Sequence, residues 1–146
     1  MVVDSVTACS TLISSRLYQI GIQVNLIDRS TGATLTGTYH GLGQADYPSQ
    51  SVDCSTVTMF GTVIEVNFGA RSHYNNRRTK AINYMSFIDD VGTVAEFGTI
   101  TSASSGIQTY SFDANNGGFI GVFGTYTEMI NIIGPYYNPG TLCTCA

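Results

Sequence analysis

The chain has 146 residues, of which 11% are charged, and its formal net charge at pH 7 is −4. This length predicts a single domain, residues 1–146, that is large enough to bury a hydrophobic core. The charged fraction is less than half of the roughly 25% typical of soluble domains, which argues against a helical bundle, a coiled coil and a charged disordered tail. Nine Tyr and seven Phe residues, in a chain with 16 Gly, favour strands and turns over helices.

The charge balance and the apolar pattern exclude two classes of partner. Only six Lys and Arg residues stand against ten Asp and Glu residues, whereas a nucleic-acid-binding protein needs a basic face to neutralise phosphates. No apolar run approaches the roughly 18 residues of a membrane-spanning segment. We therefore predict neither a nucleic-acid partner nor a membrane span.

Four cysteines, Cys9, Cys54, Cys143 and Cys145, show neither a C-x-x-C motif nor a Cys/His metal spacing. This pattern favours disulfides in a secreted protein over a zinc site. Cys143 and Cys145 are one residue apart, and an extended chain sends their side chains to opposite faces, so we do not expect them to bond each other. One of the two is expected to bond either Cys9, which would tie the ends of the chain together, or another subunit.

Alternating apolar and polar residues predict half-buried strands at residues 19–26, 57–59, 64–68 and 85–87. Turns are predicted at residues 28–32 and 89–92, and a Ser-rich loop at residues 101–105. Residues 114–118, Ala-Asn-Asn-Gly-Gly, are predicted as a hairpin turn because Asn and Gly tolerate positive φ. No helical periodicity extends beyond two turns, so the chain is expected to be all-β.

A weak internal repeat refines this expectation. Residues 81–92 align without a gap on residues 129–140, and each segment follows a loop that opens with Phe-Gly. A fainter third copy covers residues 24–32. Three copies of a unit with about four short strands predict three four-stranded Greek-key sheets, related by pseudo-threefold symmetry around a shared core. The alternative is chance similarity among strands that end in glycine.

Residues 82–98 resemble the jacalin-related lectins, with Met85-Ser86-Phe87 followed by Asp-Asp-Val-Gly and Glu-Phe-Gly. The resemblance is closer in residues 116–134, where a glycine-bounded strand is followed by Phe123-Gly124, a short loop and an Ile-Gly strand. It extends over roughly residues 56–140. The resemblance implies a β-prism I fold of three Greek keys and a carbohydrate-binding function that is non-enzymatic and metal-independent.

The resemblance also points to a ligand loop at residues 124–131. In the family this loop usually reads Gly, three residues, Asp, whereas here Thr127 and Asn131 occupy those two positions. An Asn amide has one acceptor oxygen and one donor nitrogen, so the bidentate acceptance of a carboxylate is lost. The candidate carbohydrate-binding residues are Gly124, Tyr126, Thr127, Glu128, Met129 and Asn131, with Tyr126 stacking on a sugar ring. Alternatively, Tyr126 and Met129 pack the end of the prism and Asn131 caps a turn.

The loop at residues 71–80 holds four of the six Lys and Arg residues. By the repeat it is equivalent to the loop at residues 124–131, so both are expected at the same end of the prism. Arg side chains suit sulfate, phosphate and carboxylate groups, which makes this loop a candidate second site for anionic glycans. Its candidate residues are Arg71, His73, Tyr74, Asn75, Asn76, Arg77, Arg78 and Lys80. Alternatively, it is a solvated loop that protects an edge strand from aggregation.

The sequence predicts no enzyme, no metal site and no cofactor. There is no Gly-x-Ser-x-Gly motif, and the two histidines, His40 and His73, lack a ligand spacing. A glycosidase would need two nearby carboxylates. Glu65, Glu96, Glu128 and the pair Asp89-Asp90 supply them in principle, although Asp89 and Asp90 are first of all turn residues.

Two hypotheses follow. The first is a secreted lectin that binds glycans or glycoproteins, including anionic ones, through loops at one end of a β-prism. Single-site binding of polar sugars is weak, so useful avidity would need several sites or a homo-oligomer, including a disulfide-linked dimer. The second is a secreted structural or matrix protein with the same fold, which binds acidic or sulfated polymers through the basic loop at residues 71–80.

Overall fold

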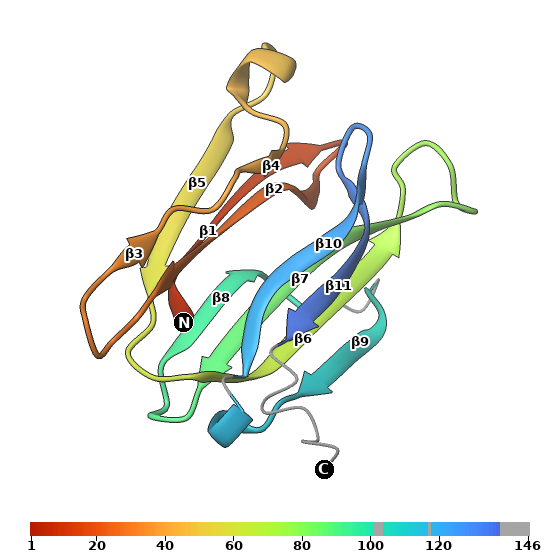
Figure 1. Ribbon diagram of the computed structural model, residues 1–146. Helices are drawn as coiled ribbons and strands as arrows, with labels where there is room; N and C mark the ends of the chain where they lie inside the picture. Colours follow the sequence, from red (N-terminus) through yellow and green to blue (C-terminus); the bar gives the residue numbers. More distant parts are fainter. Residues whose placement is uncertain (101–103, 117, 138–146) are drawn as a thin grey trace.

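The computed structural model describes residues 1–100, 104–116 and 118–137, and this part of the chain is built from strands (Figure 1). The strands are β1 (Val2–Ile13), β2 (Arg16–Ile27), β3 (Thr34–Leu35), β4 (His40–Gly41), β5 (Val52–Thr58), β6 (Val63–Ser72), β7 (Lys80–Asp89), β8 (Val94–Gly98), β9 (Ser104–Ser111), β10 (Phe119–Tyr126) and β11 (Ile130–Tyr137). Two short 3-10 turns, η1 (Gln44–Asp46) and η2 (Ala114–Asn116), are the helical elements of the described residues. None of these residues forms a helix long and apolar enough to cross a bilayer.

The strands form three antiparallel sheets, as predicted. The first has the order β3-β2-β1-β5, with β4 also paired to β2; the second has the order β8-β7-β6-β9; the third is the pair β10-β11. The all-β prediction is confirmed. Four strands were predicted for every sheet, and the second sheet has four, whereas the described residues give five strands in the first sheet and two in the third.

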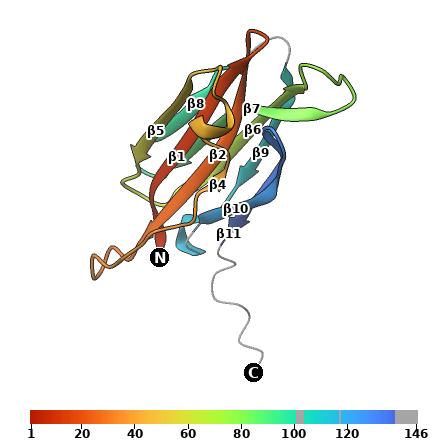
Figure 2. The ribbon, with the colours of Figure 1, turned by 90° about the horizontal axis from the view of Figure 1, so that it is seen from above.

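Each sheet is built on one long hairpin, β1–β2, β6–β7 or β10–β11. Each repeated segment found in the sequence includes part of β2, β7 or β11, the second strand of a hairpin. The repeat is therefore a repeat of hairpins. Figures 1 and 2 show the three hairpins arranged around a common interior, and β10 contacts β1, β2 and β6 across it.

The core fills the space between the three sheets. Phe87 of β7 lies at its centre, with ring centroids 5.4 Å from Phe119 of β10 and 6.2 Å from both Phe68 of β6 and Phe97 of β8. Phe87 and Phe119 are fully buried. Burial of such a side chain contributes roughly 1.5–3 kcal/mol, so aromatic packing between the second and third sheets holds these two sheets together.

A second group of buried residues, which we call the end cluster, lies where β1 turns into β2. Its members are Cys9, Ile13, Tyr18, Ile20, Tyr47, Ala81 and Met129. The Tyr18 hydroxyl donates to the Ser72 carbonyl at 2.9 Å, which joins β2 to the end of β6. The end cluster therefore supports the loops that connect the long hairpins.

The opposite end is closed by Asp89, at the end of β7. Its buried carboxylate accepts four backbone N–H groups, those of Phe60, Gly61, Val91 and Thr93. Asp90 accepts the N–H of Thr62 at 2.9 Å. The prediction that Asp89 and Asp90 are turn residues is confirmed, because both fix the chain between strands.

Three local predictions need correction. Residues 114–116 form the short 3-10 turn η2, and the predicted hairpin turn at residues 114–118, of which residue 117 lies outside the described residues, is wrong because β9 pairs with β6 and β10 pairs with β11. Strand β9 begins at Ser104, inside the predicted Ser-rich loop, of which residues 101–103 lie outside the described residues. Strand β1, which the alternation of residues did not predict, is the central partner of both β2 and β5.

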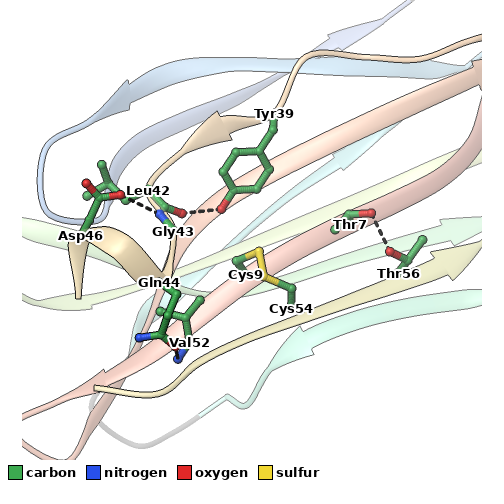
Figure 3. The surroundings of a disulfide bond; sticks show 10 residues. All are labelled: Thr7, Cys9, Tyr39, Leu42, Gly43, Gln44, Asp46, Val52, Cys54 and Thr56. Atoms are coloured by element: carbon green, nitrogen blue, oxygen red, sulfur yellow. Dashed lines mark hydrogen bonds between the residues drawn. A yellow bond between two sulfur atoms is a disulfide. The ribbon is translucent and has the colours of Figure 1, made fainter. Parts of the chain in front are cut away.

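Cys9 forms a disulfide with Cys54, with an S–S distance of 2.02 Å (Figure 3). The two residues lie directly opposite each other in the β1–β5 register. The prediction that Cys143 or Cys145 bonds Cys9 is therefore wrong, because Cys9 already faces a cysteine on the neighbouring strand. Cys143 and Cys145 lie outside the described residues.

Candidate functional site

Four segments meet at one end of the prism, which we call the loop end (Figure 1). They are the β1–β2 turn at residues 14–15, the β6–β7 loop at residues 73–79, the β10–β11 loop at residues 127–129, and residues 42–51, which contain η1. The turn at Ser14 and Ser15 has positive φ at both residues, as a tight two-residue hairpin requires. The loop end contains both predicted sites.

The β6–β7 and β10–β11 loops are in direct contact through Glu128. The Tyr74 hydroxyl donates to Oε2 of Glu128 at 2.9 Å, and Nε2 of His73 lies 3.6 Å from the same oxygen. The prediction that both loops lie at the same end is confirmed. Glu128 remains 56% exposed, so its carboxylate faces solvent while two side chains orient it.

His73 is held on two sides. Its ring stacks on Tyr74 with centroids 4.4 Å apart, and its Nδ1 accepts the backbone N–H of Asn75 at 3.1 Å. Because Nδ1 is an acceptor, this hydrogen-bond network assigns the proton of the neutral ring to Nε2, on the side of Glu128. The hydrogen bond to Glu128 raises the pKa of Tyr74, and partial burial and the negative charge add to this effect. Tyr74 therefore stays a donor at neutral pH.

Asn131 closes the β10–β11 loop. Its Oδ1 accepts the Thr127 hydroxyl at 2.9 Å, and its Nδ2 donates to the Lys80 carbonyl at 3.4 Å. The amide has capacity for one more accepted and one more donated hydrogen bond. Asn131 therefore has a structural role, as the alternative interpretation expected, and its half-buried amide still keeps polar capacity for a ligand.

The other residues of the predicted ligand loop differ in how far they are exposed to a ligand. Met129 is fully buried in the end cluster, so its side chain supports the loop from below. Tyr126, the last residue of β10, is 46% exposed and presents an aromatic surface. A Cβ added at Gly124 would collide with the Ile132 carbonyl on β11, so the close approach of the two strands requires glycine there.

The structure separates the basic residues of the second candidate site. Arg77, Arg78 and Lys80 are exposed, and the Asn76 side chain accepts the N–H of Arg78 at 3.1 Å. Arg71 instead lies within β6, and its buried Nε has no hydrogen-bond partner among the described residues. The loop therefore presents three cations to solvent.

Tyr47, which sequence analysis missed, is buried in the end cluster together with Met129. It follows η1, is 8% exposed, and its hydroxyl has no hydrogen-bond partner within the described part of the chain. Burial raises the pKa of Tyr47 to about 12, and the nearby Glu128, Tyr74 and Asp46 add to the shift. No motif marked this residue, because in residues 1–55 only the strand pattern carried information.

Two other carboxylates in the described residues accept hydrogen bonds from neighbouring side chains. Glu96 accepts the Tyr84 hydroxyl at 2.8 Å, and Glu65 accepts the Asn67 amide at 3.2 Å. No group of three or more His, Cys, Asp or Glu residues in the described ranges is arranged to hold a metal ion.

Comparison with known proteins identifies the fold. The sequence matches no protein-family model, and a search of curated proteins gives no match. Among solved structures, the lectin MPA in complex with T-antigen disaccharide is similar with a TM-score of 0.66 and 11% identity. Frutalin from Artocarpus incisa in complex with galactose gives a TM-score of 0.65 and 13% identity, and a jacalin–T-antigen complex gives 0.64 and 11%. Each comparison covers 94% of this chain and 92% of the other. The chain therefore has the β-prism fold of the jacalin-type lectins.

Proposed function

We propose that this protein is a lectin that binds neutral glycans reversibly at the loop end, without catalysis and without a metal. The observation that carries the proposal is the convergence of Tyr74, His73 and Glu128, which joins two hairpin loops into one polar surface. The similar proteins MPA, frutalin and jacalin were solved with a disaccharide or galactose bound, which supports the same ligand class here.

The polar groups suit sugar hydroxyls in both directions. Glu128 provides a carboxylate acceptor, which compensates for the carboxylate that Asn131 lacks. Asn131 adds one acceptor and one donor, and the exposed ring of Tyr126 offers a surface for the apolar face of a sugar. This division of roles makes Glu128 the main acceptor.

Secretion is part of the same proposal. The Cys9–Cys54 disulfide suits an oxidising compartment. A single small polar site binds weakly, so we also propose that function depends on presenting several sites, through a homo-oligomer or through more than one loop. A disulfide-linked dimer through Cys143 or Cys145 is one way to achieve this.

A glycan-array assay tests the proposal, with the wild type beside Glu128→Gln, Asn131→Ala and the double variant Arg77→Ala, Arg78→Ala. We expect galactose-containing neutral glycans to bind the wild type and the double variant, and to bind the first two variants at least tenfold more weakly. Binding restricted to acidic or sulfated glycans, lost in the double variant and reduced by salt, would instead favour the structural or matrix hypothesis.

A further inference from the structure

The hairpin β10–β11 presents an uncharged surface with large exposed apolar side chains. Its two strands contain sixteen residues and no charged side chain. Four large side chains on them, Phe123, Ile132, Tyr136 and Tyr137, are each at least half exposed. Contiguous exposed apolar surface on a soluble domain commonly marks a binding site, whereas single exposed apolar residues do not.

A groove of about 310 Å³ opens on this hairpin. Phe123, Tyr126, Ile132 and Tyr136 line it from β10 and β11, and Ile22 and His40 line it from the first sheet. Its volume lies at the lower end of the range of roughly 300–1,000 Å³ typical of small-molecule sites. Its lining contains no Asp, Glu, Lys or Arg side chain, so the groove suits an uncharged apolar ligand.

The groove and the proposed sugar site share the side chain of Tyr126. Tyr126 lines the groove and is also the last residue of β10 before the loop that contains Thr127 and Glu128. From Tyr126 to Phe123 the strand extends about 10 Å, at roughly 3.4 Å per residue. This length is comparable to that of an extended alkyl chain linked to a sugar at the loop end.

We propose that this groove binds the apolar aglycone of a glycoconjugate, so that the preferred ligand is an alkyl glycoside of the glycolipid type. The inference rests on the lectin function proposed above and names its ligand class. The sugar contacts Glu128 and Asn131, and the chain attached to its anomeric carbon lies along Phe123, Ile132 and Tyr136.

Calorimetry with methyl, butyl, hexyl and octyl galactosides, below their micelle-forming concentrations, tests this proposal. Each methylene that becomes fully buried raises affinity by about fourfold. Because the groove is open on one side, we expect a gain of at least tenfold from methyl to octyl. Ile132→Ser should remove most of that gain and leave the affinity for methyl galactoside unchanged.

Phe60→Ser is the matched control. Phe60 is 68% exposed, like Ile132 at 61%, but it lies at the opposite end, where its backbone N–H contacts Asp89. The control should retain the full gain. A gain equally reduced in Phe60→Ser would show that general surface hydrophobicity, not the groove, is responsible, and would overturn the proposal.

The outcomes separate this inference from the lectin proposal. Equal affinity for methyl and octyl galactosides overturns the groove proposal and leaves the lectin proposal standing. Absence of binding to every galactoside overturns both. Octyl galactoside binding that Glu128→Gln and Asn131→Ala leave unchanged would show that the groove binds alkyl chains without the sugar site, which overturns the glycoconjugate proposal. A wild-type dimer that Ile132→Ser converts to a monomer, with no gain from the alkyl chain, would assign this face to a second copy instead.

Discussion

The disulfide between Cys9 and Cys54 should supply a large part of the stability of this domain. The two cysteines are separated by 45 residues. Closing a loop of this length removes roughly 13 cal/mol/K of entropy from the unfolded chain, which corresponds to about 4 kcal/mol at 25 °C. With an unfolding entropy of roughly 2.1 cal/mol/K per residue, the loss of the disulfide should lower Tm by about 13 °C.

The test compares the wild type with the double variant Cys9→Ala, Cys54→Ala in urea and thermal unfolding. We expect the midpoint to fall and the m-value to rise, because the unfolded chain without the cross-link is less compact. The control variant replaces Cys143 and Cys145 with Ser and should keep the stability of the wild type, and non-reducing peptide mapping of the wild type should recover the Cys9–Cys54 cross-linked peptide. A loss of less than about 1 kcal/mol would refute the loop-closure argument, and recovery of Cys9 bonded to Cys143 or Cys145 would refute the pairing itself.

Three further predictions concern single side chains. Burial raises the pKa of Asp89, but hydrogen bonds from Gly61, Phe60 and Thr93 outweigh it and lower the pKa below 3.8. The stabilisation by this carboxylate should therefore be complete above its unfolded pKa of about 3.9 and disappear as the pH falls through the lower folded pKa. Asp89→Asn should lower the free energy of unfolding by roughly 3 kcal/mol at pH 7. The free energy of unfolding measured in urea should then depend less on pH in the acid range. Tyr47→Phe removes a buried hydroxyl without a described partner, so it should raise stability by roughly 1 kcal/mol, and a loss of stability would contradict that assignment. Thr127→Val, which breaks the bond to Asn131, should weaken glycan binding severalfold in calorimetry with little change in Tm, whereas Thr56→Val, which breaks an equally exposed bond to Thr7, should leave binding intact.

Sequence patterns predicted the parts of this fold in which alternation was regular. In β2, apolar residues alternate with polar ones, and the pattern identified the strand directly. The sequence repeat likewise predicted that the two loops lie at the same end, because equivalent hairpins carry equivalent loops. The hydrogen bond from Tyr74 to Glu128 joins these two equivalent loops.

The parts that were missed have physical reasons. In β1 the pairing with β2 shifts register between Val3 and Ser5 and again between Cys9 and Ser10, so the side chains do not alternate regularly. Without β1 in place, the partner of Cys9 could not be identified, because Cys54 approaches it only through the β1–β5 pairing. Tyr47 joins Met129 in the end cluster only in three dimensions, and no local sequence pattern predicts that packing.

The fixed base of the β10–β11 loop affects how a ligand would bind. Met129 anchors the loop in the interior, and the Thr127–Asn131 hydrogen bond closes it above. A loop held at both points is already ordered before a ligand arrives, so association does not have to spend free energy on ordering it. Glycan binding should then follow simple one-step kinetics without a slow conformational phase, and selectivity should depend on the fit of hydroxyl groups to a preorganised surface.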